Sequence, residues 1–322
     1  MLVEVLPYGA NIRMLLVPDA VGHVVNVVIG YSDPSMYLTE RCIMGGAIGP
    51  ICSRTEDARF VLGGITYHLP QNDGRHNLHS DMCNGFHKRE WSVKYVDESE
   101  IELTIHLPHL DLGIPGNRDV SLLYSLTDDN ELYADYHITS DCATYVNPTT
   151  HPYFNLDGEY GSTILNHVVK FRASHFLPYR KEIVPSGEIR DVLNTPFDFT
   201  QEKTMGRDID GTDEQLSIGN GYDHHFIIDD TDGTLRPFAT VSSVNSGIAM
   251  EISTTLPGFT FYTGNTFSCA GDCSGRERGK REAFCIEPCF PPNVINTPSF
   301  QQPLCDASQP FRSSTVYRFG NV

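Results

Sequence analysis

The sequence has no apolar run approaching the roughly 20 residues that a membrane-spanning helix needs, so we expect no such helix. Positive charge is scarce: 23 Lys and Arg stand against 41 Asp and Glu, for a formal net charge of -18. A surface this acidic repels phosphate backbones and anionic lipids, so neither nucleic acid nor a membrane is an expected partner. The net charge does not exclude a small neutral ligand.

Signals for export and for disulfide bonding are also missing. Residues 1–9 lack a basic start and reach proline and glycine too early for a secretory signal peptide. The nine cysteines are odd in number and scattered, which is typical of reduced thiols, so we expect a cytoplasmic protein. Two Cys-x3-Cys pairs, Cys269/Cys273 and Cys285/Cys289, offer a zinc site as an alternative. Structural zinc usually has tighter spacing, and we expect no metal.

Long amphipathic helices are absent from the pattern, because no extended window repeats every 3.6 residues. Instead, short β-rich runs separated by turn signals follow one another through the 322 residues. The clearest hairpin signals lie at 60–67, 91–107 and 121–138. Proline and glycine are spread along the chain, and there is no repeat or low-complexity segment. We therefore predict one all-β domain, residues 1–322, built as a large antiparallel β-sandwich.

One polar segment in this β-rich chain is the run Asn147-Pro-Thr-Thr-His151-Pro-Tyr153-Phe-Asn-Leu156, which follows a predicted strand at 132–138. A single histidine in such a place is more often structural than catalytic. Four residues elsewhere lie in segments of similar character and favour a functional interpretation: Arg54, His79, Asp223 and Glu287.

This segment resembles the Asn-x-Thr-Asn-His-x-Tyr-Phe-Asn-Leu motif of the aldose 1-epimerases, the galactose mutarotases. Further segments resemble motifs of the same family in the same order, and the resemblance runs from about Tyr8 to Phe319. These segments are 45–54, 72–91, 221–226, 256–265 and 284–296. The resemblance implies a galactose mutarotase-like supersandwich and an enzyme that interconverts the α and β anomers of a hexose.

The resemblance also implies roles for single residues. It implies that His151 is the catalytic acid and Glu287 the catalytic base, and that four other side chains hold the sugar: Arg54, His79, Tyr153 and Asp223. A carboxylate with an ordinary pKa of about 4.3 and a histidine near 6.5 can serve as base and acid at neutral pH. Arginine donates in a fork and an ionised carboxylate only accepts, and both complement sugar hydroxyls. The reaction involves neither redox chemistry nor group transfer, so no cofactor is expected.

The chain departs from the family's motifs at several positions near the expected site. They are Pro50 for Arg, Ser53 for Asn, Ser80-Asp81 for Gly-Gly, Thr260 for Gln, Pro288-Cys289 for Thr-Gln, and Pro292-Asn293 for Asp. We therefore expect a substrate preference other than plain galactose or glucose. His76 and His87 have no counterpart in the family, and we expect both in exposed loops.

Two alternatives stand beside a plain mutarotase. The first is an epimerase of a phosphorylated or otherwise anionic sugar, favoured by the basic cluster at 276–281, although charge runs on loops are usually just solvated. The second is a non-catalytic sugar-binding protein on the same fold, against which the retention of both His151 and Glu287 argues. The expected partner is a small sugar, bound by a monomer or homodimer.

Overall fold

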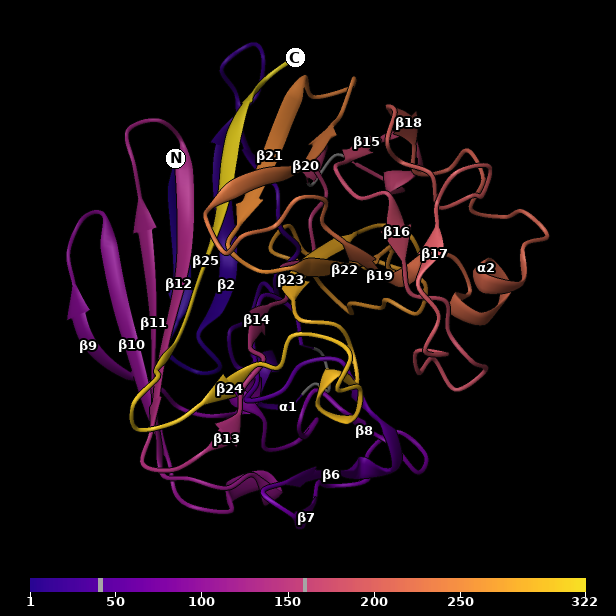
Figure 1. Cartoon of the computed structure of the whole chain (residues 1–322). Helices are drawn as coiled ribbons and strands as arrows, with labels where there is room; N and C mark the ends of the chain where they lie inside the picture. The colour runs from indigo at the N-terminus through magenta and orange to yellow at the C-terminus, as the bar shows by residue number, and fades with distance from the viewer. Residues whose placement is uncertain (40–42, 159–160) are drawn as a thin grey trace.

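The computed structural model describes residues 1–39, 43–158 and 161–322, and most of its regular structure is β-strand. In Figure 1 the long strands β9 to β12 and β25 run side by side at the left, with the shorter strands β16, β19 and β22 to their right. The two described α-helices are short, α1 Met36–Thr39 and α2 Glu214–Gly219. None of the described helices is long and apolar enough to cross a membrane. The predicted all-β fold is confirmed.

The largest sheet has nine antiparallel strands. Its order is β18 (Lys203–Thr204), β15 (Val168–Phe171), β20 (Arg236–Ser242), β21 (Ile248–Thr254), β25 (Phe311–Asn321), β12 (Glu131–Ser140), β11 (Arg118–Leu126), β10 (Glu100–Leu107) and β9 (Ser92–Val96). Along β12 buried and half-buried residues alternate, with Leu132, Ala134, Tyr136 and Ile138 buried. This period of two is what a strand with one face on the core requires.

A second, five-stranded sheet packs against the first through phenylalanines. Its order is β17 (Arg190–Asp191), β16 (His175–Phe176), β19 (Asp223–Ile227), β22 (Gly258–Tyr262) and β23 (Cys285–Cys289). Phe171 of β15 lies 4.9 Å from Phe259 of β22, and Phe238 of β20 lies 4.6 Å from the same ring, between ring centroids. Because successive strand residues face opposite ways, the neighbours of Phe259 point away from this core.

The remaining strands form small sheets around the larger two. They are β1 (Leu2–Leu6), β2 (Asn11–Pro18) and β3 (Val24–Asn26) in one sheet, and the pairs β4 (Ala47–Ile48) with β14 (Thr149–Thr150), β5 (Arg54–Thr55) with β8 (Asn77–Leu78), β6 (Arg59–Leu62) with β7 (Ile65–His68), and β13 (Thr144–Tyr145) with β24 (Leu304–Cys305). The described segments also contain five short 3-10 helices: η1 Glu56–Ala58, η2 Phe86–Lys88, η3 Asp111–Gly113, η5 Ile164–Asn166 and η6 Val294–Asn296.

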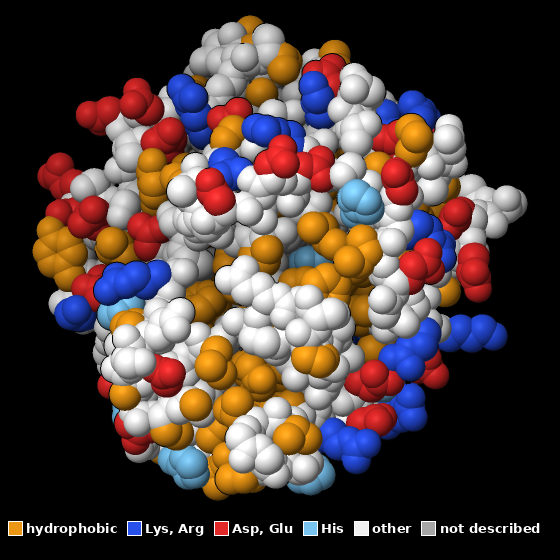
Figure 2. Space-filling model, viewed as in Figure 1, with side chains coloured by type: hydrophobic (Ala, Val, Ile, Leu, Met, Phe, Trp, Pro, Cys, Tyr) orange, Lys and Arg blue, Asp and Glu red, His pale blue; other side chains and the backbone are white. Residues whose placement is uncertain are grey.

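The three predicted hairpins are confirmed as β6–β7, β9–β10 and β11–β12. Figure 2 shows one face of the molecule, on which acidic and basic side chains are interspersed and hydrophobic side chains reach the surface near the centre. The expectation of exposed loops for His76 and His87 is wrong, since both are buried. The ring of His76 accepts a hydrogen bond from the backbone N–H of Asp57, which draws it inward.

Candidate active site

The site is built on the face of the five-stranded sheet that points away from the phenylalanine core, here called the front face. Strand register places nine residues there in three rows across β19, β22 and β23. The rows are Asp223–Tyr262–Cys285, His225–Thr260–Glu287 and Ile227–Gly258–Cys289. Glu287 is the middle residue of β23. Pro288 is tolerated beside it because β23 is an edge strand of this sheet.

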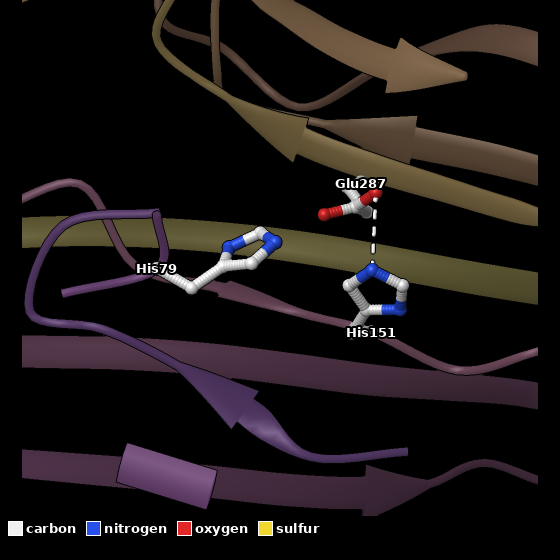
Figure 3. Close-up of side chains that lie close together, drawn as sticks. All are labelled: His79, His151 and Glu287. Carbon is white, nitrogen blue, oxygen red and sulfur yellow. Dashed lines mark ion pairs between the residues drawn. The ribbon is translucent and has the colours of Figure 1, made fainter. Parts of the chain in front are cut away.

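The second residue of the candidate site, His151, comes from the segment just after β14. Its backbone N–H donates to the carbonyl of Gly46, and its carbonyl accepts from the N–H of Gly45. Figure 3 shows the imidazole directed at the carboxyl group of Glu287, with His79 beside them. His151 Nε2 lies 3.4 Å from Glu287 Oε1, and both side chains are almost completely buried. The two groups are close enough to exchange a proton directly.

Burial acts on both members of this pair against their charged forms. It raises the pKa of Glu287 well above its usual range, and the nearby charges of Cys289 and Asp223 act in the same direction. It lowers the pKa of His151 to about 3. At a pH between the lowered pKa of His151 and the raised pKa of Glu287, the pair holds one proton. In the protein alone this proton lies on Glu287, as a carboxylic acid beside a neutral His151. Moving that proton across the 3.4 Å contact gives the carboxylate and the imidazolium.

The pair lies in a pocket of about 440 Å³. All six residues expected in the site line it: Arg54, His79, His151, Tyr153, Asp223 and Glu287. Four aromatic residues that were not expected in the site also line it: Tyr31, Tyr179, Tyr262 and Phe267. Tyr262 lies in a segment with family resemblance, 256–265, so its motif position was a usable signal, and the other three lie in none of these segments. Apolar side chains including Leu78, Met82 and Ile183 complete the wall.

Stacking contacts hold two of the aromatic rings of the pocket in place. Tyr153 stacks between the imidazole of His151, at 4.9 Å, and the ring of Phe267, at 4.6 Å between centroids. Tyr179 stacks on His224, a back-face residue of β19, at 4.8 Å, and the side chain of Gln215 bonds both the N–H and the carbonyl of Tyr179. Rings fixed in this way present a flat apolar surface to a ligand.

Charged and polar groups also line the pocket. Arg54 donates from Nε to Asp73 Oδ2 at 2.6 Å, which fixes its guanidinium next to the pocket. Burial raises the pKa of Asp223 to about 6, although the charge of Arg54 acts to lower it. Near neutral pH this carboxylate is therefore an acceptor whose protonation is sensitive to its neighbours.

The side chain of His79 is a hydrogen-bond donor to the pocket. Its Nδ1 accepts from the backbone N–H of Ser53 at 3.1 Å, so the neutral ring carries its proton on Nε2. Among the described residues, His79, His151 and Glu287 are the one group of three potential metal ligands, with ligand atoms within 4.8 Å. A metal ligand needs a free nitrogen lone pair, and His79 has none in this arrangement. The three side chains suit a sugar better than a cation.

The departures from family motifs have structural outcomes. Thr260, Ser53 and Pro292 line the pocket. Ser80 adopts a φ of +63°, the left-handed conformation that a glycine would favour, and its hydroxyl bonds both the N–H and the carbonyl of Ile51. Serine therefore keeps a left-handed backbone at this position. Cys289 is fully buried and is not among the residues that line the pocket.

The basic cluster at 276–281 is not part of the pocket lining. Arg278 is buried, donating to Asp272 Oδ2 at 2.6 Å and to the carbonyl of Gly161 at 2.7 Å. Arg281 donates to Asp210 Oδ1 at 2.7 Å, and Arg276 also donates to the carbonyl of Gly161. These side chains hold loops together, which removes the observation that favoured an anionic sugar.

The eight cysteines in the described segments are free thiols, and Cys42 lies outside the described residues. Cys285 and Cys289 project from the same face of one strand, with Glu287 between them. No cysteine belongs to the group of potential metal ligands found within the described part of the chain.

The chain is similar to known proteins over nearly its whole length. A family described as aldose 1-epimerase matches residues 1–318. The chain is 31% identical over 320 residues to the galactose mutarotase of Bos taurus, covering 98% of this chain and 90% of that protein. It is 29% identical to the aldose 1-epimerase of Escherichia coli, covering 99% and 92%. The crystal structure of an aldose epimerase homologue from C. elegans superposes with a TM-score of 0.89 at 25% identity, covering 99% of this chain and 95% of that chain.

Proposed function

This chain belongs to the aldose 1-epimerase family and is an isomerase that interconverts the anomers of a sugar, and we propose that His151 and Glu287 carry out its proton transfers. The observation that carries the proposal is the 3.4 Å contact between His151 Nε2 and Glu287 Oε1 inside a pocket of hydrogen-bonding groups.

The chemistry requires two proton transfers in each direction. Opening the hemiacetal needs one group to take the proton of the C1 hydroxyl and another to protonate the ring oxygen. The aldehyde then rotates about the C1–C2 bond, and the C5 hydroxyl closes on its other face. Closure reverses both transfers, so the pair ends with the same single proton and no cofactor takes part.

We assign the base to Glu287 and the acid to His151. These roles require the carboxylate and imidazolium form of the pair, in which the shared proton lies on the histidine. Burial disfavours that form in the protein alone. A sugar hydroxyl that donates to Glu287 stabilises its carboxylate, and a ring oxygen that accepts from His151 stabilises the imidazolium. The substrate thereby favours the reactive protonation state.

Four further residues would hold the sugar. Arg54 and His79 supply N–H donors, Asp223 supplies an acceptor for hydroxyl protons, and Tyr153 supplies a ring surface. The experiment is to follow the approach of a freshly dissolved anomer to equilibrium by polarimetry, or anomer exchange by saturation-transfer NMR, over several aldoses. If anomer exchange is no faster than the uncatalysed rate for every sugar, the proposal is wrong, and a sugar-binding protein is the better interpretation.

We also propose a single domain, residues 1–322, acting on a small aldose as a monomer or homodimer in the cytoplasm. The free thiols of the eight described cysteines support a reducing compartment. Sedimentation of the purified chain decides between the two oligomeric states.

A further inference from the structure

Two buried groups on the front face take no part in the mechanism above, the thiol of Cys289 and the imidazole of His225. Cys289 Sγ lies 3.9 Å from His225 Nδ1 and 4.0 Å from Thr260 Oγ1. Both residues are completely buried. His225 Nε2 has no hydrogen-bond partner among the described residues, so the polar contact of this ring is the one with Cys289.

A glycine makes this contact possible. His225 lies opposite Thr260 in the strand register, one row away from Cys289, whose own neighbour on β22 is Gly258. A Cβ atom at Gly258 would lie 2.4 Å from His225 Nε2. The imidazole therefore crosses β22 over a position that has no side chain, and reaches the sulfur on the far strand.

A second buried thiol, that of Cys52, interacts with the thiol of Cys289. The segments that carry Cys52 and Cys289 are joined through Asn147, whose carbonyl accepts from the N–H of Cys52 at 2.8 Å and whose Oδ1 accepts from the N–H of Phe290 at 2.9 Å. Cys52 and Cys289 also interact through their side chains, and each affects the pKa of the other. Burial raises the pKa of the Cys52 thiol and so favours its protonated form.

Burial alone would also raise the pKa of the Cys289 thiol. The contacts with Cys52 and His225 oppose that effect and hold this pKa below its ordinary value. A thiolate is thereby favoured two residues along β23 from Glu287, on the same face of the strand. Other groups that face Glu287 come from separate elements: His151 after β14, Asp223 on β19, Tyr317 on β25, and Cys52 with His79 on the loops.

We propose that Cys289 and His225 are positioning residues that act through Glu287, with a buried thiolate keeping the shared proton on the His151–Glu287 pair. A negative charge behind the carboxyl group opposes loss of that proton. The pair then retains its single proton to higher pH than it would beside a neutral residue. This inference rests on the proposed function of Glu287 and His151.

The test compares Cys289→Ser with Cys285→Ser. Cys285 is the matched control because it lies on the same strand and face and is equally buried, while its neighbour on β22 is Tyr262. We expect Cys289→Ser to move the alkaline limb of the kcat profile to lower pH by about half a unit or more, as expected for a unit charge removed some 6–7 Å away. Cys285→Ser should leave that limb in place. His225→Gln should move it in the same direction as Cys289→Ser.

A second measurement is independent of activity. The ultraviolet absorbance of a thiolate should be present at neutral pH in the wild type and in Cys285→Ser, and lost in Cys289→Ser. A wild type that exchanges anomers but shows no thiolate, or a Cys289→Ser variant with an unmoved alkaline limb, overturns this inference and leaves the proposed function standing. A wild type without exchange activity removes the proposed function and the inference together, even if the thiolate is present.

Discussion

His151 Nε2 lies 3.4 Å from Glu287 Oε1, although one residue follows the short strand β14 and the other stands in the middle of β23. The two side chains meet because the segment after β14 lies against the front face of the five-stranded sheet. Burial opposes the charge on each of them, so together they hold one proton at a pH between the lowered pKa of His151 and the raised pKa of Glu287. The predictions below depend on this pair and its surroundings.

Removing either member should abolish most of the catalysis. Glu287→Gln and His151→Asn are each expected to lower kcat by about 10²-fold or more, the usual scale for a general acid or base. Anomer exchange by NMR measures the effect, with circular dichroism confirming the fold. The matched control is His106→Asn, which breaks an exposed 2.7 Å contact to Asp119 on the large sheet and should leave kcat unchanged. A folded Glu287→Gln variant with near wild-type kcat would contradict the role of Glu287.

Because of Glu287, the free energy of unfolding should fall as the pH rises. Its pKa is higher in the folded protein than in the unfolded chain, so the folded state binds its proton more tightly. Its contribution to stability is complete below the unfolded pKa of about 4.5 and is lost as the pH rises towards the folded pKa. Glu287→Gln should therefore raise Tm at pH 7–8 by about 2–4 °C, and by little near pH 4. Thermal melts across pH measure this, and a variant less stable at pH 8 than the wild type would refute it.

Thr260 should influence substrate choice. It lines the pocket opposite Glu287 and replaces a longer amide side chain. A buried polar group left without its partner costs about 1–3 kcal/mol, so Thr260→Gln should change the ratio of kcat/KM between two aldoses by about fivefold or more. The wild type should prefer a sugar other than galactose or glucose. A wild type that is best on galactose or glucose, with ratios unmoved in Thr260→Gln, would show that the substitution is neutral.

The reactivity of each thiol towards an alkylating reagent should follow its exposure to solvent. Cys83 and Cys142 are exposed, whereas Cys52, Cys285 and Cys289 are buried. Alkylation of the native protein followed by peptide mass spectrometry should label the first two and spare the other three until the chain is unfolded. Mass measurement without reduction should find no disulfide, and metal analysis no stoichiometric zinc. One equivalent of tightly bound zinc would overturn the assignment of these cysteines as free thiols.

The class of fold and the residues of the candidate site could be predicted from the amino-acid sequence. Alternation with a period of two and closely spaced turns are local properties, so hairpins such as β11–β12 could be predicted from their own residues. The order of the motifs identified the family, and its resemblance named six residues that all line one pocket.

The contacts that these residues make could not be predicted from the sequence, because they depend on the folded arrangement of distant segments. Strand register across β19, β22 and β23 depends on segments far apart in the chain, and it alone brings His225 over Gly258 to Cys289. Burial of His87 and Arg278 could not be predicted either, because polar residues in loops usually face water, and it is long-range packing and hydrogen bonding that draw these two inside. The sequence could not give the protonation of the His151–Glu287 pair, since the pKa of each group depends on desolvation that exists only in the assembled sandwich.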